Sequence, residues 1–262
     1  MKKTEMDAGS DTNDGSQAVR KAVSLLKAIA RMDAGELSLA QIARIEGMPR
    51  STAHRMLQCL IDEGLVQRCD VGKGYQLGEV THELGMASFT HAAAIEKWRG
   101  LVKSVARRTS VTAYLMRRSG LDAACLVKAE GSGVVRVVPV EVGQRRSLGL
   151  GAGSIALLSR LDDDVVRRVE QRLKLHRHDS QLVPGETGLW ESVRLARETG
   201  FALSHGRVSN GTFGMGAVIP TGEEPPRLAI SIAAHTSLVT ESMIARWQED
   251  MREEIAIALR QA

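Results

Sequence analysis

The clearest pattern of apolar and polar positions lies between residues 38 and 64. Apolar residues recur at helical spacing over 39–45 and again from Pro49 onward, which predicts two short helices. Gly47 lies between them and favours a tight turn, because glycine adopts left-handed backbone angles without strain. Two short helices joined by such a turn are typical of a helix-turn-helix.

The second of these helices separates its residues into two faces. The apolar residues predict a buried side: Ala53, Met56, Leu57, Leu60 and Ile61. Polar residues that can bind bases or phosphate lie on the other side or at the helix start: Arg50, Ser51, Thr52, His54, Arg55 and Gln58. Arg pairs with guanine and Gln with adenine in the major groove, so this face is a candidate DNA-reading surface. A helix whose polar side is simply hydrated is the alternative interpretation.

The segments on either side extend this prediction. Residues 17–32 form a predicted helix with an apolar stripe of Val19, Val23, Leu26 and Ala30. Arg20, near its start, is a candidate phosphate contact or an ordinary solvated charge. Residues 65–69 and 75–77 read as strands around a glycine-containing turn, and a hairpin directly after a recognition helix is a wing. Arg68 and Lys73 would then lie beside the DNA backbone, with solvated surface charge as the alternative.

Residues 81–108 are predicted to be largely helical, with one helix that links two domains and another that opens the second. After this stretch the spacing of apolar residues changes. Strands are predicted over 111–117, 123–130, 134–140, 201–205, 214–220 and 227–233, and helices over 154–160, 162–175, 186–199 and 241–261. Strands in two groups with helices between and after them indicate an α+β domain with an antiparallel sheet. The expected organisation is a disordered tail over 1–16, a DNA-binding domain over 17–80, a linker helix over 81–97 and a second domain over 98–262.

Composition sets limits on these predictions. Of 262 residues, 43% are hydrophobic and only 3% aromatic, so the core must be mostly aliphatic. The net charge is +4, but residues 17–90 hold nine Lys or Arg against eight Asp or Glu, so bulk charge does not mark the DNA-binding domain. Cys59, Cys69 and Cys125 lack metal or redox spacing and fit a reducing cytoplasm. No signal peptide or membrane-spanning run is found, so we expect a cytoplasmic protein without a membrane partner.

Other candidate sites are weaker. The glycine-rich run over 149–153 lacks the Lys-Ser/Thr of a phosphate-binding loop. His176, His178 and Asp179 have no partner cysteine and favour a solvated loop over a metal site. Arg145 and Arg146 either attract an anion at a pocket mouth or are solvated. We therefore expect no cofactor, metal or catalytic residue. The alternative function is a metabolic enzyme whose winged-helix domain serves assembly, with chemistry near Ser154 or His205, but no base–nucleophile spacing supports it.

Six segments together resemble the IclR-type family of bacterial transcription regulators: AVRKAVSLLKAIA, LSLAQIARIEGMPRSTAHRMLQCLIDEGLV, GYQLG, SLGLGAGSIALLSRL, GFAL and LAISIAA. The resemblance runs from residue 17 to the C-terminus. It implies a winged helix-turn-helix domain joined by a helix to a GAF-like effector domain. It also implies a sequence-specific transcriptional regulator that binds double-stranded DNA at a palindromic operator, assembles as a homodimer or homotetramer, and responds to a small organic effector.

The resemblance also implies an effector site. In the family a Gly-Ala pair at a helix start donates backbone N–H groups to the ligand, and here the pair is Gly151-Ala152. Ser231 matches a serine of a late strand. This chain departs from the family where Ser204 begins the segment that is usually acidic, where Gly214 replaces a frequent cysteine and where Ala233 replaces a second serine. Leu148 completes the candidate set. Lost polar groups and an added glycine predict a roomier, less polar pocket for an aromatic or bulkier carboxylate.

Overall fold

A computed structural model describes residues 11–30, 37–69, 74–87, 89–133, 140–176 and 188–261. The chain forms two compact units, Met1–Phe89 and Thr90–Ala262. The strand predicted over 134–140 and the tip of the predicted hairpin fall almost entirely outside the described residues. Within the described residues, no helix has both the length and the apolar character that crossing a membrane requires.

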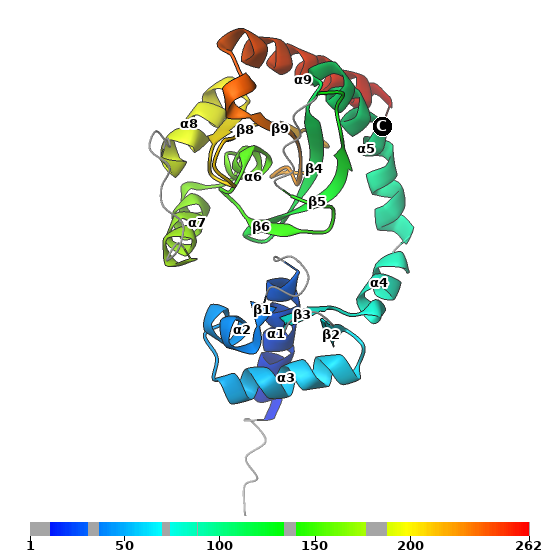
Figure 1. Ribbon diagram of the computed structural model, residues 1–262, viewed down its shortest axis with the longest axis vertical. Helices are drawn as coiled ribbons and strands as arrows, with labels where there is room; N and C mark the ends of the chain where they lie inside the picture. Colours follow the sequence, from blue (N-terminus) through cyan, green and yellow to red (C-terminus); the bar gives the residue numbers. More distant parts are fainter. Residues whose placement is uncertain are drawn as a thin grey trace, which may run out of the picture. The chain divides into compact units, whose positions relative to one another are not determined.

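The first unit is a helix-turn-helix followed by a β-ribbon (Figure 1). Its elements are α1 (Asp11–Ile29), β1 (Leu37–Ser38), α2 (Leu39–Ile45), α3 (Arg50–Asp62), β2 (Val66–Arg68), β3 (Gly74–Leu77) and α4 (Glu79–Met86). The strands pair antiparallel in the order β1-β3-β2. The predicted helix-turn-helix is therefore confirmed, and two strands follow it as the pattern indicated.

Local chemistry explains the two central helices. Ser38 caps α2, because its hydroxyl accepts from the Gln41 N–H while the Gln41 side chain accepts from the Ser38 N–H at 2.9 Å. Gly47 has a φ of +61°, so the turn needs a residue without a Cβ. The Met48 N–H then donates to the Ala43 carbonyl at 3.0 Å, which closes the turn and sets the start of α3.

The first helix differs from its prediction in both extent and orientation. Helix α1 begins at Asp11, so the last six residues of the tail predicted over 1–16 are helical. A helix extends one hydrogen bond at a time once it has nucleated, so its first turns need no apolar contacts. The predicted stripe was wrong for Val19 and Val23, which are 64% and 41% exposed. Leu25 and Ile29 instead face α2 and α3 and are buried.

The second unit is built on one six-stranded antiparallel sheet in the order β6-β5-β4-β9-β8-β7. Its strands are β4 (Thr112–Ser119), β5 (Asp122–Ala129), β6 (Arg145–Ser147), β7 (Ala202–His205), β8 (Thr212–Ile219) and β9 (Leu228–His235). Its helices are α5 (Phe89–Thr109), α6 (Ala152–Leu158), α7 (Asp163–His176), α8 (Leu189–Thr199), the short 3-10 turn η1 (Thr236–Leu238) and α9 (Glu241–Gln261). The predicted α+β class with an antiparallel sheet is confirmed.

The sheet separates two apolar layers. Figure 1 shows α6 inside the curl of the sheet, with α7 and α8 on the same side and α5 and α9 outside it. The inner layer joins Tyr114 of β4 to Ile155 of α6. The outer layer joins Trp98 of α5 and Trp247 of α9 to Leu115 of β4. Alternate residues of one strand therefore serve opposite layers, as expected for a sheet covered on both faces.

The connection between the units consists of two helices, as expected, but their bounds differ from the prediction. The linker helix was expected over 81–97, whereas α4 ends at Met86 and α5 begins at Phe89. Helix α5 then continues through the expected domain boundary at residue 98 and ends at Thr109. Gly85 and Gly100 do not interrupt these helices, since both lie within regular helical turns.

Candidate nucleic-acid interface and ligand cavity

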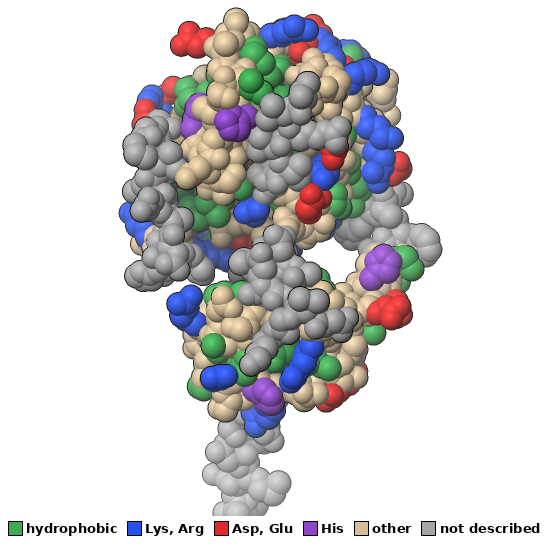
Figure 2. Space-filling model, viewed as in Figure 1, with side chains coloured by type: hydrophobic (Ala, Val, Ile, Leu, Met, Phe, Trp, Pro, Cys, Tyr) green, Lys and Arg blue, Asp and Glu red, His purple; other side chains and the backbone are tan. Residues whose placement is uncertain are grey.

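Helix α3 shows the two faces that its sequence predicts. Ala53, Leu57 and Leu60 are buried, while Met56 and Ile61 are half-buried against the same core. The candidate reading residues are on the surface, with Thr52 half-buried and the others exposed: Arg50, Ser51, His54, Arg55 and Gln58. Figure 2 shows basic and histidine side chains gathered over α3 on the face in view. The helix therefore presents a polar edge whose backbone is fixed by its buried side.

The remaining candidates of this surface lie on other elements. Arg20 is exposed on α1. Arg68 is exposed on β2, where its guanidinium lies 5.9 Å from the centre of the Tyr75 ring. Lys73 lies outside the described residues. Gln58 donates from its amide nitrogen to Asp62 at 2.9 Å, so its side chain is held along the helix with its carbonyl oxygen available.

The second unit contains a cavity between the sheet and the start of α6. Its volume is about 50 Å³, counted as space for the centres of water-sized molecules. Six of the seven effector candidates line it: Gly151, Ala152, Ser204, Gly214, Ser231 and Ala233. Leu148 does not, because it is fully buried in the inner apolar layer. Residues that the sequence reasoning did not assign to the effector site also line the cavity: Tyr114, Met116, Val140, Leu150, Ser154, Val208, Thr212 and Ile232. Arg146, which the sequence analysis placed either at a pocket mouth or in solvent, lines it too. The period-two alternation of β4 could have identified Tyr114 and Met116.

Glycines set how closely α6 approaches the sheet. A Cβ on Gly216 would lie 2.8 Å from the Ala152 carbonyl carbon and from the Gly153 nitrogen. A Cβ on Gly153 would lie 2.8 Å from the Ser231 hydroxyl oxygen. At Gly214 the nearest atom would be the Ala152 Cβ, at 3.2 Å. The room predicted from Gly214 is therefore absent, because Ala152 occupies the space that a side chain there would take.

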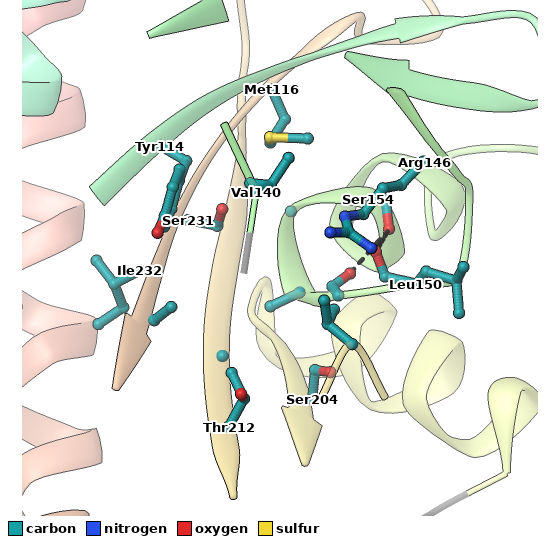
Figure 3. A pocket seen from close by; sticks show the side chains of 16 residues that line it. Tyr114, Met116, Val140, Arg146, Leu150, Ser154, Ser204, Thr212, Ser231 and Ile232 are labelled. Atoms are coloured by element: carbon teal, nitrogen blue, oxygen red, sulfur yellow. Dashed lines mark hydrogen bonds between the residues drawn. The ribbon is translucent and has the colours of Figure 1, made fainter. Parts of the chain in front are cut away.

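The cavity wall combines several hydroxyl groups with one cation. Arg146 is the only charged residue among the described residues that line the cavity. Figure 3 shows Arg146, Ser154 and Leu150 on one side of the view and Tyr114 and Ser231 on the other. The Ser154 hydroxyl donates to the Leu150 carbonyl at 2.6 Å and to the Gly151 carbonyl at 2.9 Å, so among the described residues its partners are backbone carbonyls and not the base that activates a nucleophile.

Burial determines the protonation of the phenol in the wall. Tyr114 is 2% exposed, and burial raises the pKa of its hydroxyl well above the ordinary value near 10. The phenol is therefore neutral at physiological pH. Among the described lining residues, the positive charge is therefore carried by Arg146 and the phenol adds none.

The residues considered for the enzyme alternative do not assemble into a catalytic group. His205 ends β7, and its ring packs edge-on against Phe213 with ring centres 5.1 Å apart. Among the described residues, no group of three His, Cys, Asp or Glu side chains is arranged to hold a metal ion. His176 ends α7, whereas His178 and Asp179 lie outside the described residues.

Comparison with known proteins agrees with this architecture. Residues 18–69 match the IclR helix-turn-helix domain and residues 86–257 match the bacterial transcriptional regulator IclR C-terminal domain. The HTH-type transcriptional regulator KipR of Bacillus subtilis is 25% identical over 83% of this chain and 86% of its own length. This relative is named as a regulator of transcription and not as an enzyme.

Solved structures share the fold. A putative IclR transcriptional regulator from Silicibacter sp. TM1040 superposes with a TM-score of 0.74 at 20% identity, over 93% of this chain and 95% of that one. An IclR homologue from Microbacterium hydrocarbonoxydans, complexed with 4-hydroxybenzoate, superposes with a TM-score of 0.63 at 18% identity, over 94% of this chain and 100% of that one. The chain thus belongs to the IclR family of bacterial transcriptional regulators, with an N-terminal helix-turn-helix DNA-binding domain and a C-terminal effector domain.

Proposed function

We propose that this regulator reads a specific DNA sequence with α3 and that a small organic carboxylate in the effector-domain cavity controls its binding. The exposed polar edge of α3 carries the proposal. In the described part of the chain, neither Arg50 nor Arg55 is engaged in an ion pair or a side-chain hydrogen bond. Both guanidinium groups are therefore available for bases or phosphates, and bidentate pairing with guanine is the commonest specific contact of arginine.

The other candidates divide by the contact they favour. Gln58, with its amide nitrogen held by Asp62, offers a carbonyl oxygen that accepts from the amino group of adenine or cytosine. Ser51, Thr52 and His54 occupy the first turns of α3, the part of a recognition helix that approaches the groove. Arg20, Arg68 and Lys73 are assigned to phosphates, because they lie on other elements, where positive charge raises affinity without reading sequence.

Exposed apolar side chains of the first unit support assembly of two copies. Val19 on α1 is 64% exposed, and Leu84 and Met86 on α4 are 61% and 59% exposed. Large apolar side chains left exposed on these two helices are candidates for an interaction surface. We propose a homodimer that covers these helices and presents two copies of α3 to a palindromic operator, with half-sites about 34–36 Å apart or a multiple of it. Pairing of effector domains would extend the dimer to a homotetramer.

The cavity favours an anion with an apolar body. Arg146 supplies its charge, and Gly151 and Ala152 line it with backbone beside the start of α6. Tyr114, Met116 and Val140 supply apolar surface. The structural neighbour complexed with 4-hydroxybenzoate shares this fold and supports an aromatic carboxylate as the class of effector. Since the space of about 50 Å³ is small, an aromatic ring requires side-chain rearrangement, for which the flexible Met116 is well suited.

Charge-matched ligand pairs test this assignment. Calorimetry would measure the binding of three ligands to the wild-type protein and to Arg146→Gln. These are 4-hydroxybenzoate, its neutral amide, and pyruvate as a small keto acid. We expect the wild type to prefer the acid over the amide by about tenfold, the factor expected for a charge-assisted hydrogen bond, and Arg146→Gln to lose that preference. Arg160→Gln is the matched control, because it removes an exposed arginine outside the cavity. Tight binding of pyruvate alone would contradict the aromatic assignment.

DNA reading is tested separately. Fragments of the source genome would be selected by the purified protein and sequenced, and the enriched sites footprinted. We expect a palindromic consensus protected on two successive major-groove faces. Recovery of fragments without any shared sequence would contradict specific reading, whatever the ligand experiment shows. Ligand control would follow from differential affinity for two arrangements of the protomers, typically about 1–3 kcal/mol of coupling.

A further inference from the structure

Three arginines meet at one end of the effector-domain sheet, away from the effector cavity. Arg117 and Arg118 lie near the end of β4, and Arg227 directly precedes β9. The Arg118 N–H donates to the Arg227 carbonyl at 2.8 Å, so the two strand ends are fixed side by side. These arginines, with Ser119 and Gly120, line a separate cavity of about 330 Å³.

The positive charge of this arginine cluster is poorly compensated. Arg227 has a carboxylate partner, because its Nε lies 3.4 Å from Glu223 Oε2. Across the residues that the structure describes, the Arg117 and Arg118 side chains have no ion-pair or hydrogen-bond partner. The Arg118 Nε is also shielded from solvent and has no acceptor. A buried donor without an acceptor is unfavourable, so the site favours an incoming oxygen ligand.

The neighbouring Arg145 also has a buried Nε without an acceptor, but its guanidinium has a carboxylate partner, which Arg117 and Arg118 lack in the described part of the chain. Arg145 and Arg172 both approach Asp122, at 3.7 Å and 3.2 Å. Asp122 is 3% exposed, so those charges are compensated within the fold. The contrast separates an internal structural ion cluster from the open cavity beside Arg117 and Arg118.

We propose that the arginine cluster is a second ligand site, which binds a small phosphate-bearing anion. Three guanidinium groups and the Glu223 carboxylate leave a local charge of +2. A phosphate monoester carries about −1.5 to −2 at pH 7 and compensates this charge, whereas a monocarboxylate leaves about half of it. The planar guanidinium fork also matches phosphate oxygens bidentately.

The surroundings give such a ligand room for more than one phosphate. Arg117 and Arg227 also line an adjoining groove of about 430 Å³, which includes Lys97. The Lys97 ammonium lies 5.0 Å from the centre of the Trp98 ring and adds a fourth cation beside the cluster. A diphosphate, or a phosphate carrying a small polar body, therefore fits the site better than inorganic phosphate alone.

Calorimetric titration of the full-length protein with pyrophosphate, inorganic phosphate and acetate at constant ionic strength tests the proposal. We expect saturable binding of one pyrophosphate per chain, weaker binding of phosphate and no measurable binding of acetate. Arg117→Gln and Arg118→Gln should each weaken pyrophosphate binding at least about tenfold, because each removes charge-assisted hydrogen bonds. Arg160→Gln removes the same charge from an exposed position outside the cluster and should bind as the wild type does.

Several results would overturn the proposal. These are an absence of saturable heat with the wild type, equal losses in Arg160→Gln, or acetate binding as tightly as pyrophosphate. If Arg118→Gln weakens binding of random-sequence duplex DNA but leaves pyrophosphate binding unchanged, the cluster is a nucleic-acid surface and the proposal is wrong. Tryptophan fluorescence checks that each variant is folded, and Arg227→Gln, at a side chain 64% exposed, provides an independent third variant.

Discussion

Adding one methyl group at Gly216 should displace the start of α6 and destabilise the effector domain. A Cβ there would lie 2.8 Å from the carbonyl carbon of Ala152, 2.8 Å from the nitrogen of Gly153 and 2.9 Å from the Ala152 oxygen. Carbon atoms in contact are normally about 3.5–4.0 Å apart, and these neighbours are backbone atoms that cannot rotate away. We therefore expect Gly216→Ala to cost about 3 kcal/mol, the upper part of the usual range for overpacking.

Tryptophan fluorescence during thermal unfolding measures this effect selectively. Trp98, Trp190 and Trp247 are the only tryptophans of the chain, and all three lie in the second unit, so the signal reports that domain. For a domain of this size, about 3 kcal/mol lowers the midpoint by about 6–12 °C. Effector binding should weaken as well, because Ala152 and Gly153 line the cavity.

The same substitution at two other glycines provides controls. Gly214→Ala should cost less, since its nearest contact would be the Ala152 Cβ at 3.2 Å. Gly100→Ala should raise the midpoint, because Gly100 is an exposed position of α5 with nothing within 4 Å of the added Cβ. Alanine in a helix is favoured over glycine by about 1 kcal/mol. Equal midpoints for Gly216→Ala and the wild type would refute the close approach of α6 to the sheet.

Three further predictions follow from other parts of the molecule. Arg55→Ala should weaken operator binding by about 1–3 kcal/mol in fluorescence anisotropy if this arginine reads a base, and unchanged affinity would remove it from the reading surface. Arg108 forms an ion pair with Asp250, and their side chains are 31% and only 10% exposed. Arg108→Ala should therefore destabilise the effector domain by about 3 kcal/mol, the lower end of the range for breaking a buried ion pair. A loss below about 0.5 kcal/mol would contradict this. Burial, with a smaller contribution from Glu141, raises the pKa of the Cys125 thiol to about 12, so a thiol reagent at pH 8 should modify exposed Cys59 and spare Cys125 until unfolding. Operator DNA should slow the modification of Cys59, and an unchanged rate would argue against α3 in the groove.

Local patterns predicted the elements of the first domain well, because the features that specify them lie within a few residues. The cap at Ser38 and the turn at Gly47 act on their immediate neighbours, and the apolar repeat of α3 fixes its buried side. The predicted burial of Val19 and Val23, in contrast, was wrong. Their spacing indicates an apolar face, but only the packing of α1 against α2 and α3 decides which apolar face is covered within one chain.

The sites of the second domain depend on contacts between distant segments. Strand β4 pairs with β9, more than 100 residues later, and this pairing brings Arg118 beside Arg227. Neither residue is notable in its own segment. Similarly, Gly214 suggested an enlarged pocket in the sequence, yet Ala152 from α6 fills that space. Such groupings follow from strand register and close packing, which residue spacing alone does not specify.

Equilibrium binding of the full-length protein to its selected operator, measured by fluorescence anisotropy with and without 4-hydroxybenzoate, tests the central claim most directly. The account predicts preference for the operator over random duplex DNA, and at least about a fivefold change in operator affinity with the ligand, equivalent to about 1 kcal/mol of coupling. The ligand should have no such effect on Arg146→Gln. Equal affinity for operator and random DNA, with or without ligand, would contradict the account.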